Sequence, residues 1–324
     1  MIQSLKPSNH INNFKNDGKY RVLSLDGGGA KGFYTLGVLR EVEAMIGCPI
    51  YQCFDLIFGT STGSIIGTLL AQGKSVSEIY ELYKKHVPTV MNCKTKSGRS
   101  AALEKLSKEI FQDSRFSDVK TGIGVVATKW QLETPMIFKG DIAQAHGREA
   151  TFVPGFGVPI ADAIQASCSA YPFFNRKTVV TSRGDEIELI DGGYCANNPT
   201  LYALADAVKV AGKNLEDLRV LSIGVGFYPE PKPTILMKLL KNLISVQLLE
   251  KTLEINTQSM EQLRSILYKN VPTVRVSDTY SQPEMATDLL ESDLTKLNLL
   301  CQRGSESYAK KEAAIKDLLL GEGQ

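Results

Sequence analysis

Hydrophobic and polar positions along the chain predict alternating strands and helices between residues 20 and 224. Short apolar runs predict strands, and segments with apolar residues at every third or fourth position predict helices. The predicted strands are 20–25, 54–58, 122–128, 135–139 and 219–224, with a hairpin over 177–190. The predicted helices are 33–46, 62–70, 75–86, 160–168 and 199–211. This alternation is typical of an α/β fold with a mostly parallel sheet that is covered by helices on both faces.

The pattern changes on either side of this region. Residues 1–19 are rich in Asn and Lys and have no periodicity, so we predict a loose N-terminal arm. The proline-spaced run 228–233 predicts an extended break. Beyond it the pattern is helical, with one short strand predicted at 273–276. We therefore divide the chain into an arm (1–19), an α/β core (20–228) and a C-terminal helical region (229–324).

The strongest candidate for a nucleophile is Ser61, which lies between Gly59 and Gly63 in a G-x-S-x-G motif. An apolar strand ends at Phe58 and an apolar helix starts directly after the serine. This is the strand–turn–helix setting of a nucleophile elbow, in which a Cβ at the glycine positions would clash. An ordinary helix start capped by serine or threonine is the alternative. The setting favours the elbow.

A serine nucleophile needs a base, and the histidines do not supply one in the usual order. Hydrolases with this elbow place the serine first, the acid second and the histidine last. The three histidines are His10, His86 and His146, and none follows the candidate acid Asp191. Each lies in a polar segment that is typical of a solvated side chain.

Asp191 is the candidate base. It follows an apolar strand end, so its carboxylate should emerge at the edge of the sheet where sites of α/β proteins lie. Together with Gly192 and Gly193 it also fits a plain turn. Because no histidine follows it, we predict that Ser61 and Asp191 form a dyad that needs no histidine.

A glycine-rich loop with G-x-G-x-x-G spacing follows the first strand, over residues 27–32. A dinucleotide-binding fold would require an acid at the end of the next strand, whereas Asp55 begins that strand. A plain tight turn would also explain the glycines. The third interpretation is an oxyanion hole made of backbone N–H groups. We favour it because this loop and the Ser61 motif close consecutive strands. The donors would belong to Gly27, Gly28 and Gly29.

Composition excludes several classes of function. With 37 Lys and Arg against 35 Asp and Glu, the net charge of +2 gives no field that would attract DNA or RNA. Six scattered cysteines without a CxxC pair predict reduced thiols in a cytoplasm. No His/Cys/Asp cluster has metal-ligand spacing, and no run approaches the ~20 apolar residues of a membrane span. We expect a metal-free cytoplasmic protein whose membrane contact is peripheral.

One basic segment lies between Lys84 and Lys108, with seven Lys and Arg and a single acid, Glu104. The plain interpretation is a solvated loop. The alternative is a patch that meets anionic lipid head groups or a phosphate-bearing ligand.

Three motifs occur in the order D-G-G-G-A-K-G (26–32), G-T-S-T-G (59–63) and D-G-G (191–193), and together they resemble the patatin-like phospholipase family over residues 18–228. The resemblance implies a metal-free hydrolase of fatty acyl esters in lipids, with a three-layer α/β/α fold. It implies that Ser61 is the nucleophile, Asp191 its base and 27–29 the oxyanion hole, so that 20–228 is the catalytic domain. Lys31 stands where the family usually has arginine. The glycines that support the motifs are Gly32, Gly59, Gly63, Gly192 and Gly193.

The compact core and the long helical tail are also similar to bacterial patatin-like effectors of anti-phage signalling systems. Those lipases are switched on by cyclic nucleotides such as cyclic GMP–AMP and degrade the host's inner membrane. The similarity implies a phospholipase A with no cofactor, with membrane phospholipids as substrate and a cyclic dinucleotide, foremost cyclic GMP–AMP, as activator. It is compatible with a homo-oligomer that meets the inner membrane when active. No residue in the sequence is assigned to the activator.

An enzyme that attacks its own membrane needs an inactive state. The region 229–324 exceeds what the α/β core requires, so we expect it to act as a regulatory cap over the cleft of Ser61. A ligand opens such a cap by binding its open state more tightly than its closed state. The rival functions are an unregulated soluble esterase and a nucleotide-binding regulatory protein with an inert serine.

Overall fold

The computed structural model describes residues 14, 17–145, 149–209, 212–229 and 242–321, with only the backbone for 242–247. Most of the predicted N-terminal arm, His10, His146 and most of the predicted proline break lie outside the described residues.

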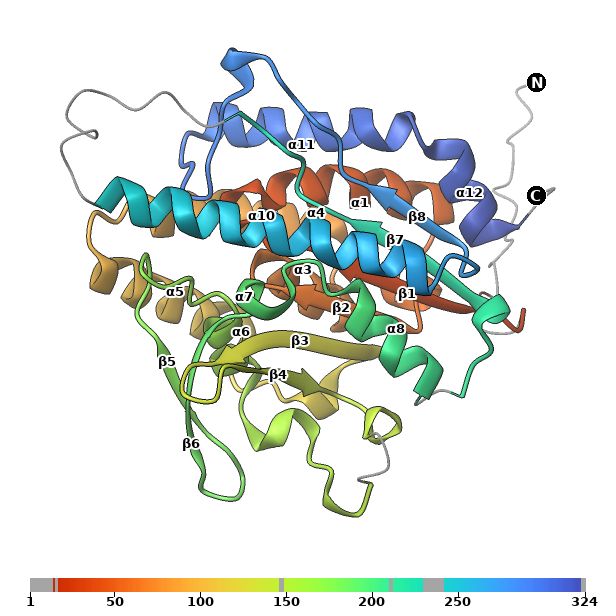
Figure 1. Cartoon of the computed structure of the whole chain (residues 1–324), viewed down its shortest axis with the longest axis horizontal. Coiled ribbons are helices and arrows are strands. Elements are labelled where there is room, and N and C mark those ends of the chain that lie inside the picture. The colour runs from red at the N-terminus through yellow and green to blue at the C-terminus, as the bar shows by residue number, and fades with distance from the viewer. Residues whose placement is uncertain (1–13, 15–16, 146–148, 210–211, 230–241, 322–324) are drawn as a thin grey trace, which may run out of the picture.

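The core of the molecule is one mixed sheet in the order β5-β6-β3-β2-β1-β7-β8, with β4 paired to β3 (Figure 1). The strands are β1 (Tyr20–Leu25), β2 (Leu56–Thr60), β3 (Gly122–Lys129), β4 (Thr134–Lys139), β5 (Lys177–Val180), β6 (Glu186–Asp191), β7 (Leu218–Ile223) and β8 (Thr273–Val276). From β3 through β2, β1 and β7 to β8 the neighbours are parallel. Only β4 and β6 run antiparallel to β3, and β5 antiparallel to β6.

Helices cover both faces of this sheet. They are α1 (Gly32–Ile46), α2 (Ile50–Cys53), α3 (Thr62–Ala71), α4 (Val76–Met91), α5 (Lys96–Phe111), α6 (Ile160–Ser167), α7 (Gly193–Ala196), α8 (Thr200–Lys209), α10 (Asn242–Leu267), α11 (Leu294–Ala309) and α12 (Glu312–Leu320). Alternate residues of a strand point to opposite faces, so Leu23 of β1 packs in the larger core with α1, α3 and α4, and Val22 packs in the smaller core against α8. The predicted three-layer α/β/α fold is confirmed.

The helices α4 and α5 differ from the sequence-based expectation. The predicted helix near His86 continues to Met91 and contains Pro88. The basic segment was interpreted as a solvated loop, and this is wrong: most of it is the end of α4 and the length of α5. The Thr95 side chain caps α5 by accepting a hydrogen bond from the N–H of Gly98 (3.0 Å), and apolar residues on its inner face are buried. Lys105 and Lys108 are exposed on the outer side of α5, whereas Arg99 is partly buried and donates to the carbonyl oxygen of Phe173 (3.3 Å).

The C-terminal region contributes to the same sheet and the same core. β8 pairs in parallel with β7, from Thr273 beside Val220 to Val276 beside Ile223. α11 lies along α1 (Figure 1), and glycine allows the two helices to approach closely: a Cβ on Gly37 would lie 1.9 Å from the carbonyl oxygen of Cys301. Within the described residues, no helix is both long enough and apolar enough to cross a bilayer.

Candidate active site

Strand register brings the predicted motifs together at one point of the sheet. Leu25 of β1 lies beside Gly59 of β2, so the loops that follow these two parallel strands are neighbours. β2 pairs in parallel with one edge of β3, and β6 pairs antiparallel with the other edge. Thr60 lies beside Val126, and the next residue of β3, Ala127, lies beside Asp191. β6 and β2 therefore end at the same level on either side of β3, and this brings Asp191 close to Ser61, the residue after β2.

Ser61 occupies a strained turn between β2 and α3. Its φ of 52° and ψ of −124° lie in a region that costs a non-glycine residue on the order of 1–3 kcal/mol. The turn is tight enough to require glycine: a Cβ on Gly59 would lie 2.3 Å from the carbonyl oxygen of Gly63, and one on Gly63 would lie 2.3 Å from that of Leu25. Strain of this kind at a strand-to-helix turn is what a nucleophile elbow imposes.

Side chains near the turn hold its backbone in place. The N–H of Ser61 donates to Oγ of Ser167 (3.0 Å), which in turn donates to the carbonyl oxygen of Val126 (2.6 Å). Oγ of Ser64 donates to the carbonyl oxygen of Ser61 (2.6 Å). The side chain of Ser61 is thus left to face the adjacent cavity, and the residue is 9% exposed.

Asp191 is buried at the wall of the same cavity, with 2% of its surface exposed. The N–H of Gly193 donates to its Oδ1 (2.7 Å). Burial raises the pKa of the carboxyl to about 6, against the hydrogen-bonding interactions with the N–H of Gly193 and the hydroxyl of Ser61, which lower it. A carboxylate with a pKa this close to neutrality is suited to accept a proton from a serine and to release it again.

The described histidine has no contact with this pair. His86 lies on α4 with its Nε2 3.7 Å from a carboxylate oxygen of Glu109, and it does not line the cavity. Within the described residues, no group of three or more His, Cys, Asp and Glu side chains is placed to hold a metal ion.

The three glycines of the loop after β1 have different surroundings. The N–H of Gly27 donates to the carbonyl oxygen of Asn197 (3.0 Å). Gly28 and Gly29 line the cavity beside Ser61, and among the residues that the structure describes their N–H groups have no hydrogen-bond acceptor. Of the three glycines, Gly28 and Gly29 thus combine a place at the cavity with N–H groups that the described residues leave without an acceptor.

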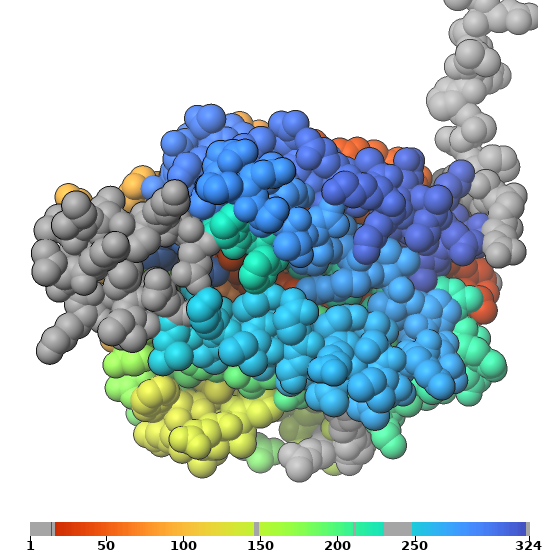
Figure 2. Space-filling model, turned by 45° about the horizontal axis from the view of Figure 1, so that its top comes forward, coloured from red at the N-terminus to blue at the C-terminus, as the bar shows by residue number. Residues whose placement is uncertain are grey.

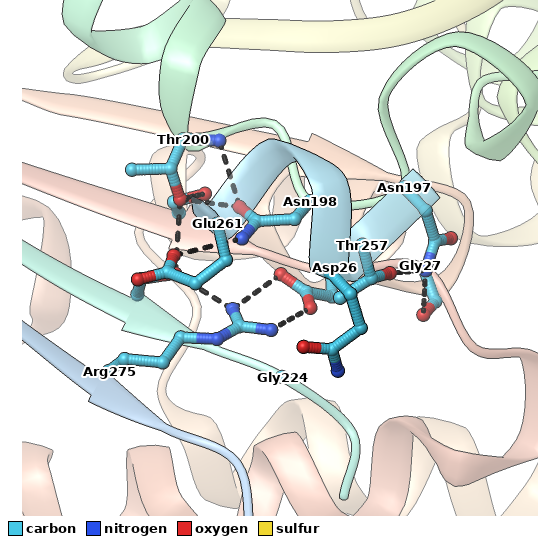
Figure 3. A network of polar contacts seen from close by, with 12 residues as sticks. Asp26, Gly27, Asn197, Asn198, Thr200, Gly224, Thr257, Glu261 and Arg275 are labelled. Atoms are coloured by element: carbon cyan, nitrogen blue, oxygen red, sulfur yellow. Dashed lines mark hydrogen bonds and ion pairs between the residues drawn. The ribbon is translucent and has the colours of Figure 1, made fainter. Parts of the chain in front are cut away.

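Residues far along the chain hold this loop. Both carboxylate oxygens of Asp26 bind the guanidinium of Arg275 in β8, and Arg275 also donates to Oγ of Ser222 (2.8 Å) (Figure 3). The N–H of Ala30 donates to the carbonyl oxygen of Leu289, in the loop before α11 (3.0 Å). Sequence reasoning missed Arg275, since no local signal links it to a residue 249 positions earlier.

The cavity above Ser61 is apolar and narrow. Its volume is about 70 Å³, little more than two water molecules occupy in the liquid. Helices α4 and α5 and the segment before β5 supply one wall, and the C-terminal region supplies Leu253, Leu289 and Leu290. The remaining apolar lining residues are Ile65, Tyr83, Val87, Val90, Met91, Leu103, Leu106, Cys168, Ala170, Phe173 and Phe174.

Residues 23–204 match the family described as patatin-like phospholipase. The chain belongs to this family. It is 61% identical over 320 residues to the cUMP-AMP-activated phospholipase of Escherichia coli, covering 99% of this chain and 100% of that one. It is 30% identical over 217 residues to the cGAMP-activated phospholipase of Pseudomonas aeruginosa (63% of this chain, 62% of that one). A third relative, the cGAMP-activated phospholipase of Vibrio cholerae, is 26% identical over 234 residues (63% of each chain). The protein is thus an ester-hydrolysing phospholipase.

In this patatin-like phospholipase, helix α10 contacts the segment that follows Asp191 directly. The N–H of Asn197 donates to Oδ1 of Asn256 (2.8 Å), and its side-chain amide donates to Oγ1 of Thr257 (2.7 Å) (Figure 3). A Cβ on Gly193 would lie 2.5 Å from Leu253. Sequence reasoning did not find these contacts, because nothing in α10 resembles a motif. The remaining motif glycines, Gly32 and Gly192, also lie where a Cβ would come within 3 Å of another residue.

Proposed function

We propose that Ser61 and Asp191 are the catalytic dyad of a phospholipase A that cleaves fatty acyl esters of membrane phospholipids under the control of a cyclic dinucleotide. The observation that carries the dyad is that β2 and β6 end at the same level on either side of β3, so that a strained serine and a buried carboxylate of raised pKa line one apolar cavity. The family membership and the phospholipase activity of the relatives support the substrate class.

In the proposed reaction, Oγ of Ser61 attacks the ester carbonyl while Asp191 accepts its proton. The carbonyl oxygen becomes an oxyanion, and the N–H groups of Gly28 and Gly29 stabilise it. The tetrahedral intermediate collapses by breaking the bond to the lysophospholipid oxygen, which takes the proton from Asp191. Water then attacks the acyl-enzyme, Asp191 takes the water's proton and returns it to Oγ, and the fatty acid leaves.

The narrow cavity supports a closed, inactive state. Sites that hold ligands of drug size or larger have volumes of roughly 300–1,000 Å³, and this cavity measures about 70 Å³. An acyl chain therefore requires the walls to move. Leu253, Leu289 and Leu290 are walls supplied by the region 229–324, which we propose as the regulatory cap.

The activator that we propose first is cUMP–AMP. Sequence analysis favoured cyclic GMP–AMP, which the 30% identical relative's name supports, but the 61% identical relative is a cUMP-AMP-activated phospholipase. To shift the cap from about 1% to about 99% open, the ligand needs roughly 5.5 kcal/mol of differential affinity. Such control would suit an effector of anti-phage signalling that is held inactive in the cytoplasm and acts at the inner membrane.

The test is fatty-acid release from vesicles of bacterial phospholipids with no ligand, with cUMP–AMP and with cyclic GMP–AMP, each in parallel with the S61A variant. We expect release in the presence of cUMP–AMP and none from the variant. Equal release under all three conditions would leave an unregulated lipase. A fluorophosphonate probe that fails to label Ser61 under conditions in which fatty acid is released would refute the dyad. A phospholipid with two different acyl chains identifies the position that is cut.

A further inference from the structure

Helix α10 carries an unusual number of exposed apolar side chains on its outer surface. Leu248, Ile255 and Ile266 are 65%, 68% and 62% exposed. Leu263 and Leu267, on the same helix, are also exposed. Figure 2 shows α10 as an uncovered band across the face that is turned forward. Single exposed apolar residues are ordinary on a protein surface, whereas five on one helix point to an interaction site.

The spacing of these residues places them on one line. An α-helix turns 100° per residue, so Leu248, Ile255 and Ile266 lie within about 20° of one another around the axis and span about 27 Å along it. Leu263 and Leu267 widen the line toward the C-terminal end of the helix. We call these five residues, with the exposed polar residues between them, the outer face of α10.

The exposed charged residues on and next to the outer face of α10 are basic. From residue 248 to residue 270, every carboxylate is half-buried, and the exposed charged residues are Lys251 and Lys269. Glu261, for example, turns aside to pair with Arg264. The other exposed polar residues of this stretch are neutral: Gln258, Ser259, Gln262, Ser265 and Asn270. An apolar line with lysines and without exposed carboxylates is typical of a helix that lies in the interface of an anionic membrane.

The inner face of the same helix forms part of the active site. Leu253 lines the cavity above Ser61, and Asn256 and Thr257 hold the loop of Asn197. A surface that binds the outer face of α10 is therefore separated from the nucleophile by the thickness of one helix.

We propose that the outer face of α10 is the surface with which this protein docks on an anionic phospholipid bilayer. This inference rests on the proposed phospholipase function, because the substrate of the enzyme is itself the bilayer that the lysines and the apolar line fit. Docking places the helix that closes the cavity against the lipid, so a phospholipid that leaves the bilayer has a short path to Ser61.

The test uses the S61A variant as parent, so that vesicles stay intact, and measures co-sedimentation with vesicles of phosphatidylethanolamine and phosphatidylglycerol. Replacing Leu248, Ile255 and Ile266 together by Gln should weaken binding at least about tenfold, because the apolar burial of three side chains is lost. The matched control replaces exposed apolar residues elsewhere, L132Q with V180Q, and should bind as the parent does. K251Q with K269Q should weaken binding to anionic vesicles and reduce its sensitivity to salt.

Two further measurements separate this inference from its rivals. In the presence of active Ser61, the triple variant should keep its hydrolysis of a soluble short-chain ester while losing hydrolysis of vesicles. If it loses both, the outer face serves folding or catalysis and the inference fails. If light scattering shows that the triple substitution dissociates an oligomer without changing vesicle binding, the face is a contact between copies of this chain, and the inference is overturned. Vesicle binding that depends on the outer face would stand even if no fatty acid were released, so failure of the proposed function is distinguishable.

Discussion

The turn of Ser61 and the glycine loop after β1 lie side by side, yet they are held in different ways. The turn is fixed by its own glycines, by Ser64 three residues on, and by Ser167 from the adjoining α6. The glycine loop is fixed by Arg275 and Leu289, which follow it by some 250 residues in the chain. The proposed nucleophile is therefore part of the buried core, whereas the proposed oxyanion donors depend on contacts with the C-terminal region.

This difference indicates where control can act. A change in the C-terminal region can shift the donors of Gly28 and Gly29, and the wall formed by Leu289, without disturbing Ser61. Moving the turn itself would break the packing of the buried core, which tolerates little change in volume.

S61A should have the largest effect, because it removes the proposed nucleophile, which lies in the buried core. We expect hydrolysis to fall at least about 10⁴-fold with little change in thermal stability, because loss of one hydroxyl leaves almost no void. Fatty-acid release and thermal unfolding check this. A variant that retains a tenth of the activity would exclude Ser61 as the nucleophile.

D191N should be nearly as damaging, with a loss of about 10³- to 10⁴-fold, because an amide cannot accept the serine proton. It should also stabilise the fold. The pKa of Asp191 rises from 3.8 to about 6 on folding, so the ionised carboxylate costs about 3 kcal/mol at pH 7. The gain in melting temperature over the parent should grow as the pH rises from about 4 to 6 and then level off. H86A is the matched control and should be mild in both measurements.

The pH profile tests the same carboxylate in the unmodified enzyme. Asp191 must be ionised to act as a base, and its pKa is raised to about 6. We expect kcat/KM to be constant above this value and to fall about tenfold per pH unit below it. A profile with its acid limb near pH 4 would mean that Asp191 is not the base.

R275K tests how the glycine loop is anchored, without changing the turn of Ser61. Lysine keeps the charge but cannot bind both carboxylate oxygens of Asp26, so the loop should lose its alignment. We expect kcat to fall about 10- to 100-fold, less than the 10²- to 10³-fold cost of losing an oxyanion donor. R264K, on α10, is the control. If R275K leaves kcat unchanged, the glycine loop does not depend on β8.

E250A should have the smallest effect, and of the opposite sign. Glu250 of α10 accepts a hydrogen bond from the N–H of Leu289 (3.2 Å), and this contact helps to hold the wall over the cavity. Losing this hydrogen bond should destabilise the closed position of the wall by about 1 kcal/mol. The activity without activator should therefore rise about fivefold. E254A on the same helix is the control. Lower basal activity in E250A would contradict the role of this wall as a closed cap.

Much of the catalytic core could be predicted from the sequence because its signals are local. The glycines around Ser61 indicate a turn that residues with a Cβ could not form, and the alternation of strands and helices predicts the layers. α5 was missed since its buried leucines lie among basic residues that favoured a loop. A cap from the region 229–324 was expected, but its lining residues Leu253, Leu289 and Leu290 were not identified, because in the sequence they resemble ordinary helix and loop residues.

By itself, the sequence determined the α/β architecture, the family and the candidate dyad, because strand ends, tight turns and glycine positions are properties of short segments. Only the tertiary structure decided that β6 runs antiparallel to β3 and ends level with β2, that Arg275 anchors Asp26, and that α10 lines the cavity with one face and exposes apolar residues on the other. Those outcomes depend on which distant segments become neighbours in the folded chain. The burial and pairing energies that bring together residues some 250 positions apart leave no pattern in the sequence between those residues.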